Sequence, residues 1–169
     1  MSLATNLANA KSTVDYVKKK VPIGASNKLS DIFASRGESL GCVVGSRIGQ
    51  QLEDIGVFRA AWAAGKLRIE VLALGTEKAG CGNCGEQSAV AWVYLWKNLR
   101  VTPIDWMCVA GGDHAFVVIG RSAKSSPEDY STWGKEAVVC DPWDNKAYAA
   151  RYIHNFMKGT PRFKSMLWA

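Results

Sequence analysis

The stretch GCGNCGEQSAVAWVYLW, from Gly80 to Trp96, places two cysteines three residues apart at the start of an apolar run. With Asn83 as the N-cap, Glu86 falls at the third helical position, a capping-box spacing that predicts a helix beginning at Cys84. In the first turn of a helix, unpaired backbone N–H groups and the helix dipole favour a thiolate over a thiol. Cys84 is therefore the candidate nucleophile, and its backbone N–H is a candidate donor to an oxyanion.

A thiolate nucleophile needs a base, and the base needs a group that orients it. The chain has 2 histidines, and His114 lies 30 residues after Cys84 in the apolar stretch DHAFVVIGR. A lone histidine in an apolar strand is also a common core residue. The second histidine, His154, lies in the basic C-terminal part and is interpreted as a surface or helix residue.

The orienting group comes from the stretch EAVVCDPW. If this stretch and the His114 strand pair as a hairpin with Gly120 opposite Lys135, then Asp141 lies directly opposite His114 and can hold the imidazole by a hydrogen bond. A shift of the register by one residue would place Asp141 on the other face of the sheet. An aspartate before Pro142 is also a typical turn residue, so the assignment depends on the register.

The elements around these residues run from helices to antiparallel strands, an order typical of the α+β class. Helices are predicted over residues 4–20, around 29–33 and around 48–64, and strands over 102–112, 113–121 and 136–143. The glycine-rich residues 37–49 are interpreted as a loop or a loosely wound helix. Residues 67–75 are rich in β-forming residues and fit either a strand or a helix, and a short helix is expected near 148–157.

The composition allows one domain with a core of its own. The 169 residues are 48% hydrophobic, enough to fold without a disulfide or metal, so the 5 cysteines are expected to be reduced and Cys42 to be buried filler. We divide the domain into a helical N-terminal part (1–66), a catalytic core (67–150) and a basic tail (151–169). The first residues lack a signal-peptide pattern and no apolar run approaches the roughly 20 residues that span a bilayer, so a soluble protein is expected.

The net charge of +6 is unevenly placed: it is +4 over residues 1–66, −2 over 67–150 and +4 over 151–169. Aromatic residues do not interleave with the basic ones in the manner of a nucleic-acid platform, so nucleic acid is not an expected partner. The basic ends are interpreted as solvated surface or as a contact for an acidic membrane surface or an acidic partner.

Three stretches resemble one superfamily. GNCGEQSAVAWVYL resembles the G-x-C-G-E helix start of transglutaminase-like enzymes such as peptide N-glycanases, DHAFVVIG is similar to their histidine strand, and AVVCDPW to their aspartate strand, in the same order Cys, His, Asp. The resemblance covers roughly residues 75–145. It implies a papain/transglutaminase-like α+β fold in which a central buried helix carrying Cys84 packs on an antiparallel sheet carrying His114 and Asp141.

The same resemblance implies an activity. The superfamily includes cysteine proteases, transglutaminases, and glutamine or asparagine deamidases that bacteria use as secreted effectors and toxins. Cys84 would attack a carboxamide, His114 would move the proton and Asp141 would orient His114, with no cofactor and no metal. We expect deamidation of a protein substrate, such as a host protein reached through a dedicated secretion system, ahead of proteolysis or transamidation.

One feature departs from the papain-like proteases. They commonly have a glutamine six residues before the cysteine, where this chain has Lys78, so the second oxyanion donor is unassigned. Asn83, Trp106 and Trp143 are the remaining candidates for the oxyanion site or the pocket wall, although buried packing is the ordinary role of tryptophan.

Three interpretations of other classes remain open: a zinc site, a redox pair and a non-enzymatic interaction module. Cys81 and Cys84 form a C-x-x-C, which with Cys108, Cys140 or His114 gives four zinc ligands, or which alone gives a redox pair. The second closely spaced pair of a structural zinc site is missing. The third interpretation is an interaction module that keeps the fold and does not turn over, in which case substituting Cys84 would leave the biological effect intact.

Overall fold

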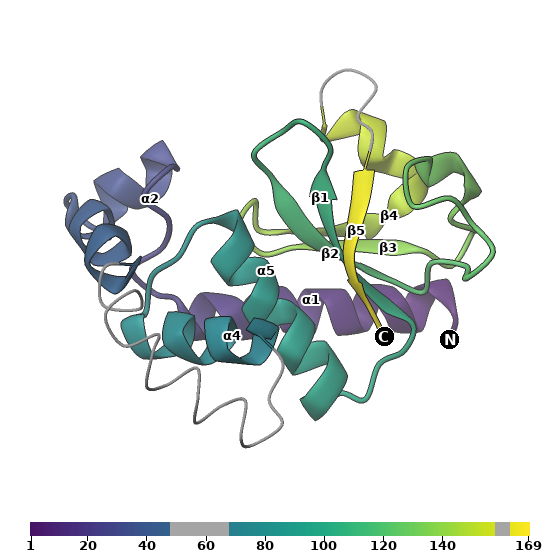
Figure 1. Cartoon of the computed structure of the whole chain (residues 1–169), viewed down its shortest axis with the longest axis horizontal. Helices are drawn as coiled ribbons and strands as arrows, with labels where there is room; N and C mark the ends of the chain where they lie inside the picture. Colours follow the sequence, from purple (N-terminus) through teal and green to yellow (C-terminus); the bar gives the residue numbers. More distant parts are fainter. Residues whose placement is uncertain (48–67, 158–162) are drawn as a thin grey trace.

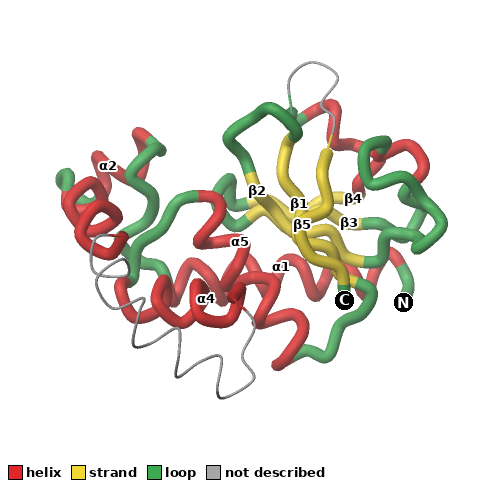
Figure 2. The backbone as a smooth tube through the Cα atoms, in the orientation of Figure 1, coloured by secondary structure: helices red, strands yellow, loops and turns green. Residues whose placement is uncertain are grey.

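The computed structural model describes residues 1–47, 68–157 and 163–169, and the helix predicted around 48–64 lies outside them. The chain is α+β: helices gather on one side of a five-stranded antiparallel sheet with strand order β4-β3-β2-β1-β5. Figure 2 shows the two layers, with α1 extending from the helical group to below the strands. The coarse fold class predicted from the sequence is confirmed.

The helical layer is built on α1 (Leu3–Lys20) and α5 (Cys84–Val93). Ser2 caps α1 by accepting a hydrogen bond from the Thr5 backbone N–H at 3.2 Å, and the helix ends in three lysines that suit its C-terminal dipole. The helix α5 continues as a π-helical turn, Tyr94–Asn98. Both helices match the predicted ones closely, because their apolar residues recur at helical spacing.

Of the stretch 67–75, which fitted either a strand or a helix, residues 68–75 are described and belong to the helix α4 (Arg68–Ala79). The helix interpretation is confirmed and the strand interpretation is wrong. The buried side chains Ile69, Ala73 and Thr76 of α4 recur every three to four residues, which gives one face that packs on α5. The packing of this face on α5 therefore outweighs the β-propensity of the individual residues.

A small helical group lies at the left of Figure 1. It contains α2 (Leu29–Ala34) and a helix described over residues 38–47, where the sequence favoured a loop or a loosely wound helix. Gly37, with φ of +86°, separates the two, a backbone conformation that glycine adopts readily.

The strands are β1 (Ile104–Val109), β2 (Ala115–Ile119), β3 (Val138–Asp141), β4 (Lys146–Ala149) and β5 (Phe163–Trp168). The C-terminal part differs from prediction: the helix expected near 148–157 is the strand β4 followed by a 3₁₀ helix, Ala150–Asn155. Residues 163–168, assigned to a basic tail, form β5 and pair with β1. The end of the chain therefore completes the sheet.

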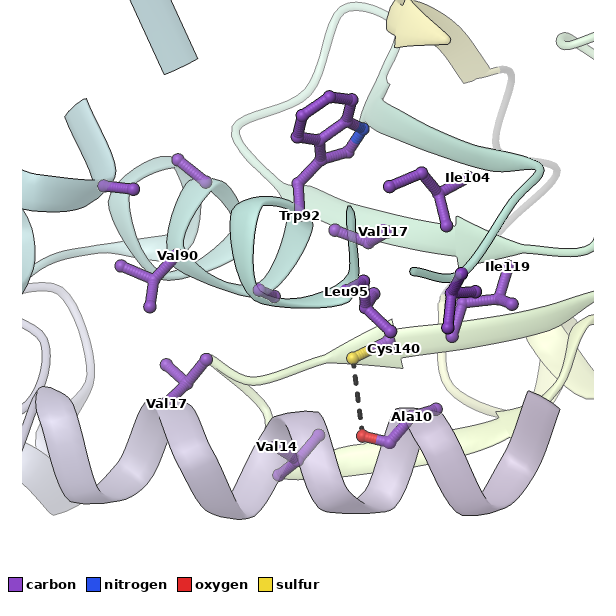
Figure 3. Close-up of a cluster of buried hydrophobic side chains, with 14 of the residues drawn as sticks. Ala10, Val14, Val17, Val90, Trp92, Leu95, Ile104, Val117, Ile119 and Cys140 are labelled. Atoms are coloured by element: carbon purple, nitrogen blue, oxygen red, sulfur yellow. Dashed lines mark hydrogen bonds between the residues drawn. The ribbon is translucent and has the colours of Figure 1, made fainter. Parts of the chain in front are cut away.

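Both faces of the sheet are buried. On one face, Trp92 of α5 and Leu95 of the π-helical turn lie beside Ile104, Val117 and Ile119, as Figure 3 shows. In the same view α1 passes under β3, where the Cys140 thiol donates to the Ala10 carbonyl at 3.6 Å.

The other face is covered by the connection after β2 and by the C-terminal segment. Phe116, Trp133 and Phe163 are its largest buried side chains. All residues of β2 are consequently buried, so β2 is the central strand and its N-terminal end is held rigidly.

Cys42 and Cys81 form a disulfide, with their Cα atoms 6.2 Å apart. The expectations of five reduced cysteines and of Cys42 as buried filler are therefore wrong. The partners are 39 residues apart, and the sequence carries no spacing signal that pairs them. The bond joins the helix of residues 38–47 to the loop that precedes Cys84.

In the three described ranges, no helix is both long enough and apolar enough to cross a membrane.

The packing of α5 on the sheet is testable. We expect Leu95→Ala to lower the free energy of unfolding by about 2–5 kcal/mol, because Leu95 is fully buried and its loss leaves a cavity. Leu74→Ala is the matched control, since Leu74 lies on α4 with 53% of its surface exposed and should change the value by less than about 0.5 kcal/mol. Urea titration measures both, and equal losses would contradict the assigned core.

Candidate active site

A short parallel pairing places the start of α5. The Ile23 N–H donates to the Gly80 carbonyl at 3.0 Å, and the Gly82 N–H donates to the Gly24 carbonyl at 3.1 Å. Gly24 has φ of +83°, and a Cβ there would lie 2.6 Å from a carboxylate oxygen of Asp31, so this position requires glycine. The segment after α1 thus runs alongside the loop before Cys84.

The N-terminus of α5 is capped as the sequence predicted. Asn83 is the N-cap and forms a capping box with Glu86, whose Oε2 accepts from the Asn83 N–H at 3.1 Å. The backbone N–H and hydroxyl of Ser26 both donate to Asn83 Oδ1, at 2.9 and 3.1 Å. Arg47 donates to Glu86 from Nε and Nη2, at 2.8 and 2.6 Å. These contacts fix the first turn from three sides.

Cys84 is the first residue of α5 and is 7% exposed. Its thiol donates to the carbonyl oxygen of Asp113, the residue before His114, at 3.4 Å, and it lies near enough to His114 to raise the pKa of the imidazole. The structure therefore brings together the cysteine and the histidine that sequence reasoning paired, from the helix layer and the sheet layer.

His114 is held from its other side by Asp141. The distance from His114 Nε2 to Asp141 Oδ2 is 2.6 Å, and the Asp144 backbone N–H donates to Asp141 Oδ1 at 3.2 Å. With Nε2 engaged, Nδ1 is the ring nitrogen left for Cys84. Both oxygens of the buried carboxylate are thus used to orient one imidazole, which is the relationship that a nucleophile, base and orienter require.

The register that produces this pair differs from the predicted one. Val117 pairs with Cys140 and Ile119 with Val138, two residues away from the register that sets Asp141 directly opposite His114. His114 itself lies just before β2. A shift of two residues keeps both side chains on the same face, so they meet diagonally across the strand ends.

The connection between β2 and β3 explains the shift. It contains the 3₁₀ turn Tyr130–Thr132 and the fully buried Trp133, whose indole N–H donates to the Ser126 carbonyl at 2.9 Å. The packing of this loop determines which residues of β2 and β3 face each other, and the assumed pairing of Gly120 with Lys135 does not form.

The charge on His114 is strongly stabilised. Burial lowers the pKa of His114. The hydrogen bond that it donates to Asp141 and the interactions with Cys84 outweigh burial and raise the pKa to about 10. An imidazolium held between a sulfur and a carboxylate is therefore the form expected at neutral pH.

A cavity of about 480 Å³ opens beside Cys84 and His114. Its wall includes the polar residues Asn27, Arg47, Asn83 and Glu86 and the apolar side chains of Leu72, Trp106 and Ala115. Trp106 is thus a wall residue, and its indole N–H donates to the Ser88 hydroxyl at 2.8 Å.

Trp143 lies on the other side of His114, with the two ring centroids 5.3 Å apart in an edge arrangement. Its indole N–H donates to Asn27 Oδ1 at 2.9 Å, and Lys28 Nζ donates to its carbonyl at 2.5 Å. Sequence reasoning placed Trp143 near the site but missed Asn27 and Lys28. No spacing in the sequence connects residues 27 and 28 to a site more than 50 residues away.

The C-x-x-C interpretation loses one partner, because Cys81 is bonded to Cys42. Cys84 is a free thiol, as are Cys108 and Cys140. Cys140 is fully buried under α1, and burial raises the pKa of its thiol, so it has the setting of a core residue.

No protein-family model matches the chain, and neither the curated proteins nor the solved structures contain a match. The site is therefore interpreted from its own geometry.

The raised pKa of His114 predicts a pH-dependent stability. Because the pKa rises from 6.5 to about 10 on folding, the stabilisation is complete below pH 6.5 and is lost as the pH rises toward 10. Urea unfolding of the Cys84→Ser chain, in which no neighbouring thiol titrates, should show this decline over a narrower pH range, because the Cys84 contribution to the His114 pKa is lost and the Asp141 contribution remains. Asp141→Asn in the same background should remove the decline. Asp144→Asn is the matched control, since Asp144 supports Asp141 through its backbone. An unchanged decline in Asp141→Asn would contradict the assigned pair.

The geometry also predicts selective thiol reactivity. We expect iodoacetamide to modify Cys84 quickly in the wild type and at least tenfold more slowly in His114→Ala, because the imidazole no longer takes the thiol proton. Cys108 lines the same cavity without a histidine partner and serves as the internal control. Peptide mass spectrometry follows both residues. Equal slowing of Cys84 and Cys108 would show that the substitution disturbed the fold rather than the nucleophile.

Proposed function

We propose that the protein is a cysteine-dependent amide hydrolase of papain/transglutaminase-like fold that acts on carboxamides of a protein substrate. The observation that carries the proposal is the order of three side chains: Cys84 at the start of α5 and His114 before β2 line one cavity, and Asp141 at the end of β3 holds His114 from its other side. The resemblance of the three sequence stretches to transglutaminase-like enzymes supports it independently.

The proposed reaction has two halves. With the thiol proton already on His114, the Cys84 sulfur attacks the carboxamide carbon, so that a C–S bond forms and the carbonyl electron pair moves to oxygen. His114 then protonates the leaving nitrogen as the C–N bond breaks, which leaves an acyl-thioester. Water, deprotonated by His114, attacks the thioester, releases a carboxylate and restores the thiol.

Deamidation of glutamine or asparagine side chains is the proposed outcome. The cavity opens to solvent and combines apolar lining surface with the polar side chains of Asn27 and Asn83, a setting that suits a side-chain amide presented by a folded protein. The deamidases that this chain resembles include bacterial effectors and toxins, which supports a host protein as the target and delivery by a dedicated secretion system. The Cys42–Cys81 disulfide is compatible with passage through an oxidising compartment.

Main-chain cleavage is the second candidate, and one observation favours it. A second cavity of about 290 Å³ shares only His114 with the first and is lined by apolar groups that include Val109, Phe156 and Met157. The leaving nitrogen departs toward His114, so this cavity gives room for a leaving group larger than ammonia. Transamidation follows the same first half and differs only in the nucleophile that ends it.

An acidic partner is proposed for the basic end of α1. Burial lowers the pKa of Lys18, and the charges of Lys28 and Asp141 also act on it, so this end of α1 lies within electrostatic range of the site. A substrate with an acidic surface would be attracted there. Binding to acidic vesicles in place of protein would assign this charge to a membrane.

The activity is tested by incubating the protein with extracts of candidate host cells and measuring intact and peptide masses. We expect an increase of about 1 Da per converted glutamine or asparagine, because an NH₂ group is replaced by OH. Cys84→Ala and His114→Ala should abolish the shift. His154→Ala, which removes the exposed second histidine, is the matched control and should retain it.

Other readouts separate the alternatives. A split chain identifies proteolysis, and a conjugate identifies transamidation. If Cys84→Ala keeps the biological effect, the protein acts as an interaction module and the enzyme proposal fails.

A further inference from the structure

We infer that the Asn27 side-chain amide is the second oxyanion donor of the site, beside the backbone N–H of Cys84. The inference rests on the proposed function, since it assigns the group that stabilises the tetrahedral intermediate of that reaction. The position from which papain-like proteases supply this donor holds Lys78 in this chain.

The backbone pairing places Asn27 beside the nucleophile. Gly24 pairs with Cys81 in a parallel bridge, and Ser26 donates to Asn83. The segment after α1 and the loop before α5 therefore lie parallel, and facing residues are separated by 57 positions in both pairs. The next pair at this offset is Asn27 and Cys84. Both residues line the same cavity, together with His114.

The orientation of the Asn27 amide follows from one hydrogen bond. Its Oδ1 accepts from the Trp143 indole N–H at 2.9 Å, and the Trp143 ring lies against His114. The oxygen is thus directed to the histidine side of the site, and the amide NH₂ is left as a donor. No residue in the described ranges accepts a hydrogen bond from this group.

The other side-chain donors near Cys84 are engaged elsewhere. The Trp106 indole N–H donates to Ser88, and the Gln87 amide donates to the Gly82 carbonyl at 2.8 Å. Arg47 is paired with Glu86. Asn83 is the remaining competitor, but its Oδ1 is fixed over the helix start by Ser26 and by the capping box.

The physical role is electrostatic. When the carbonyl carbon becomes tetrahedral, negative charge moves to its oxygen, and two prepositioned N–H donors stabilise that charge without reorganisation. The Cys84 N–H lies in the first turn of α5, where backbone N–H groups have no intrahelical partner. Asn27 adds a donor from a separate segment, so the oxygen is bound from two directions.

Two reactions of Cys84 separate this role from the nucleophile. Acylation by a p-nitrophenyl ester passes through a tetrahedral oxyanion, with a C–S bond formed and p-nitrophenolate released. Alkylation by iodoacetamide displaces iodide at carbon and forms no oxyanion. An oxyanion donor therefore affects the first rate and not the second.

The first variant is Asn27→Asp, which keeps an oxygen to accept from Trp143 and replaces the amide donor by a negatively charged carboxylate. Asn27→Ala removes the donor without adding a charge, so the two variants together separate the loss of the donor from the effect of the charge. We expect the acylation rate to fall about 10²–10³-fold, the loss typical of one oxyanion donor, while the alkylation rate of Cys84 changes less than about threefold. Asn27→Ala should give a similar loss. Asn98→Ala, which alters an exposed asparagine at the far end of the same helical run, is the control and should change neither rate.

Each contrary result has one meaning. Unchanged acylation in Asn27→Asp would overturn the inference and leave Asn27 as an anchor for Trp143, with the proposed function intact. Loss of acylation in Asn83→Asp instead would move the donor to Asn83. A wild-type chain in which neither probe reacts selectively at Cys84 would overturn the proposed function, and this inference with it.

Discussion

The burial of α5 is the constraint on which the site depends. Apart from its first turn, this helix has no polar face, so it must be enclosed by α1, α4 and the sheet, and its axis is fixed by packing on β2. A helix enclosed on all sides can present chemistry only at an end. The proposed nucleophile accordingly lies at the N-terminus of α5, near the start of the central strand, where Asp141 holds His114.

The parts of the structure that follow from local patterns were predictable, and the parts that follow from long-range contacts were not. The capping box of Asn83 and Glu86 and the helix from Cys84 depend on neighbouring residues, so the sequence specified them. The identity of α4 depends on its packing against α5, and the strand β5 depends on β1, so neither could be read from its own residues. The assumed hairpin predicted that His114 and Asp141 share a face of the sheet, but β2 and β3 are buried along their whole length and, apart from Asp141, apolar, so no polar alternation fixed their alignment.

The contact of His114 with Asp141 was predicted correctly although the strand register on which the prediction rested was wrong. The register was wrong by two residues, yet an even shift preserves the face of a strand, and a diagonal pair remains within hydrogen-bond distance. Asn27 illustrates the opposite case. Its place beside Cys84 is set by the parallel pairing of two loops and by Gly24, and no periodicity in the chain encodes such a contact.

The Cys42–Cys81 disulfide has a consequence for the chemistry of Cys84. In a C-x-x-C sequence the nearest competitor for a reactive thiol is the other cysteine, and oxidation of the pair would remove the nucleophile. Here Cys81 already has a partner, so it has no thiol with which to cap Cys84. The bond from Cys42 to Cys81 thus prevents a disulfide between Cys81 and Cys84 and leaves the sulfur of the proposed nucleophile free under oxidising conditions.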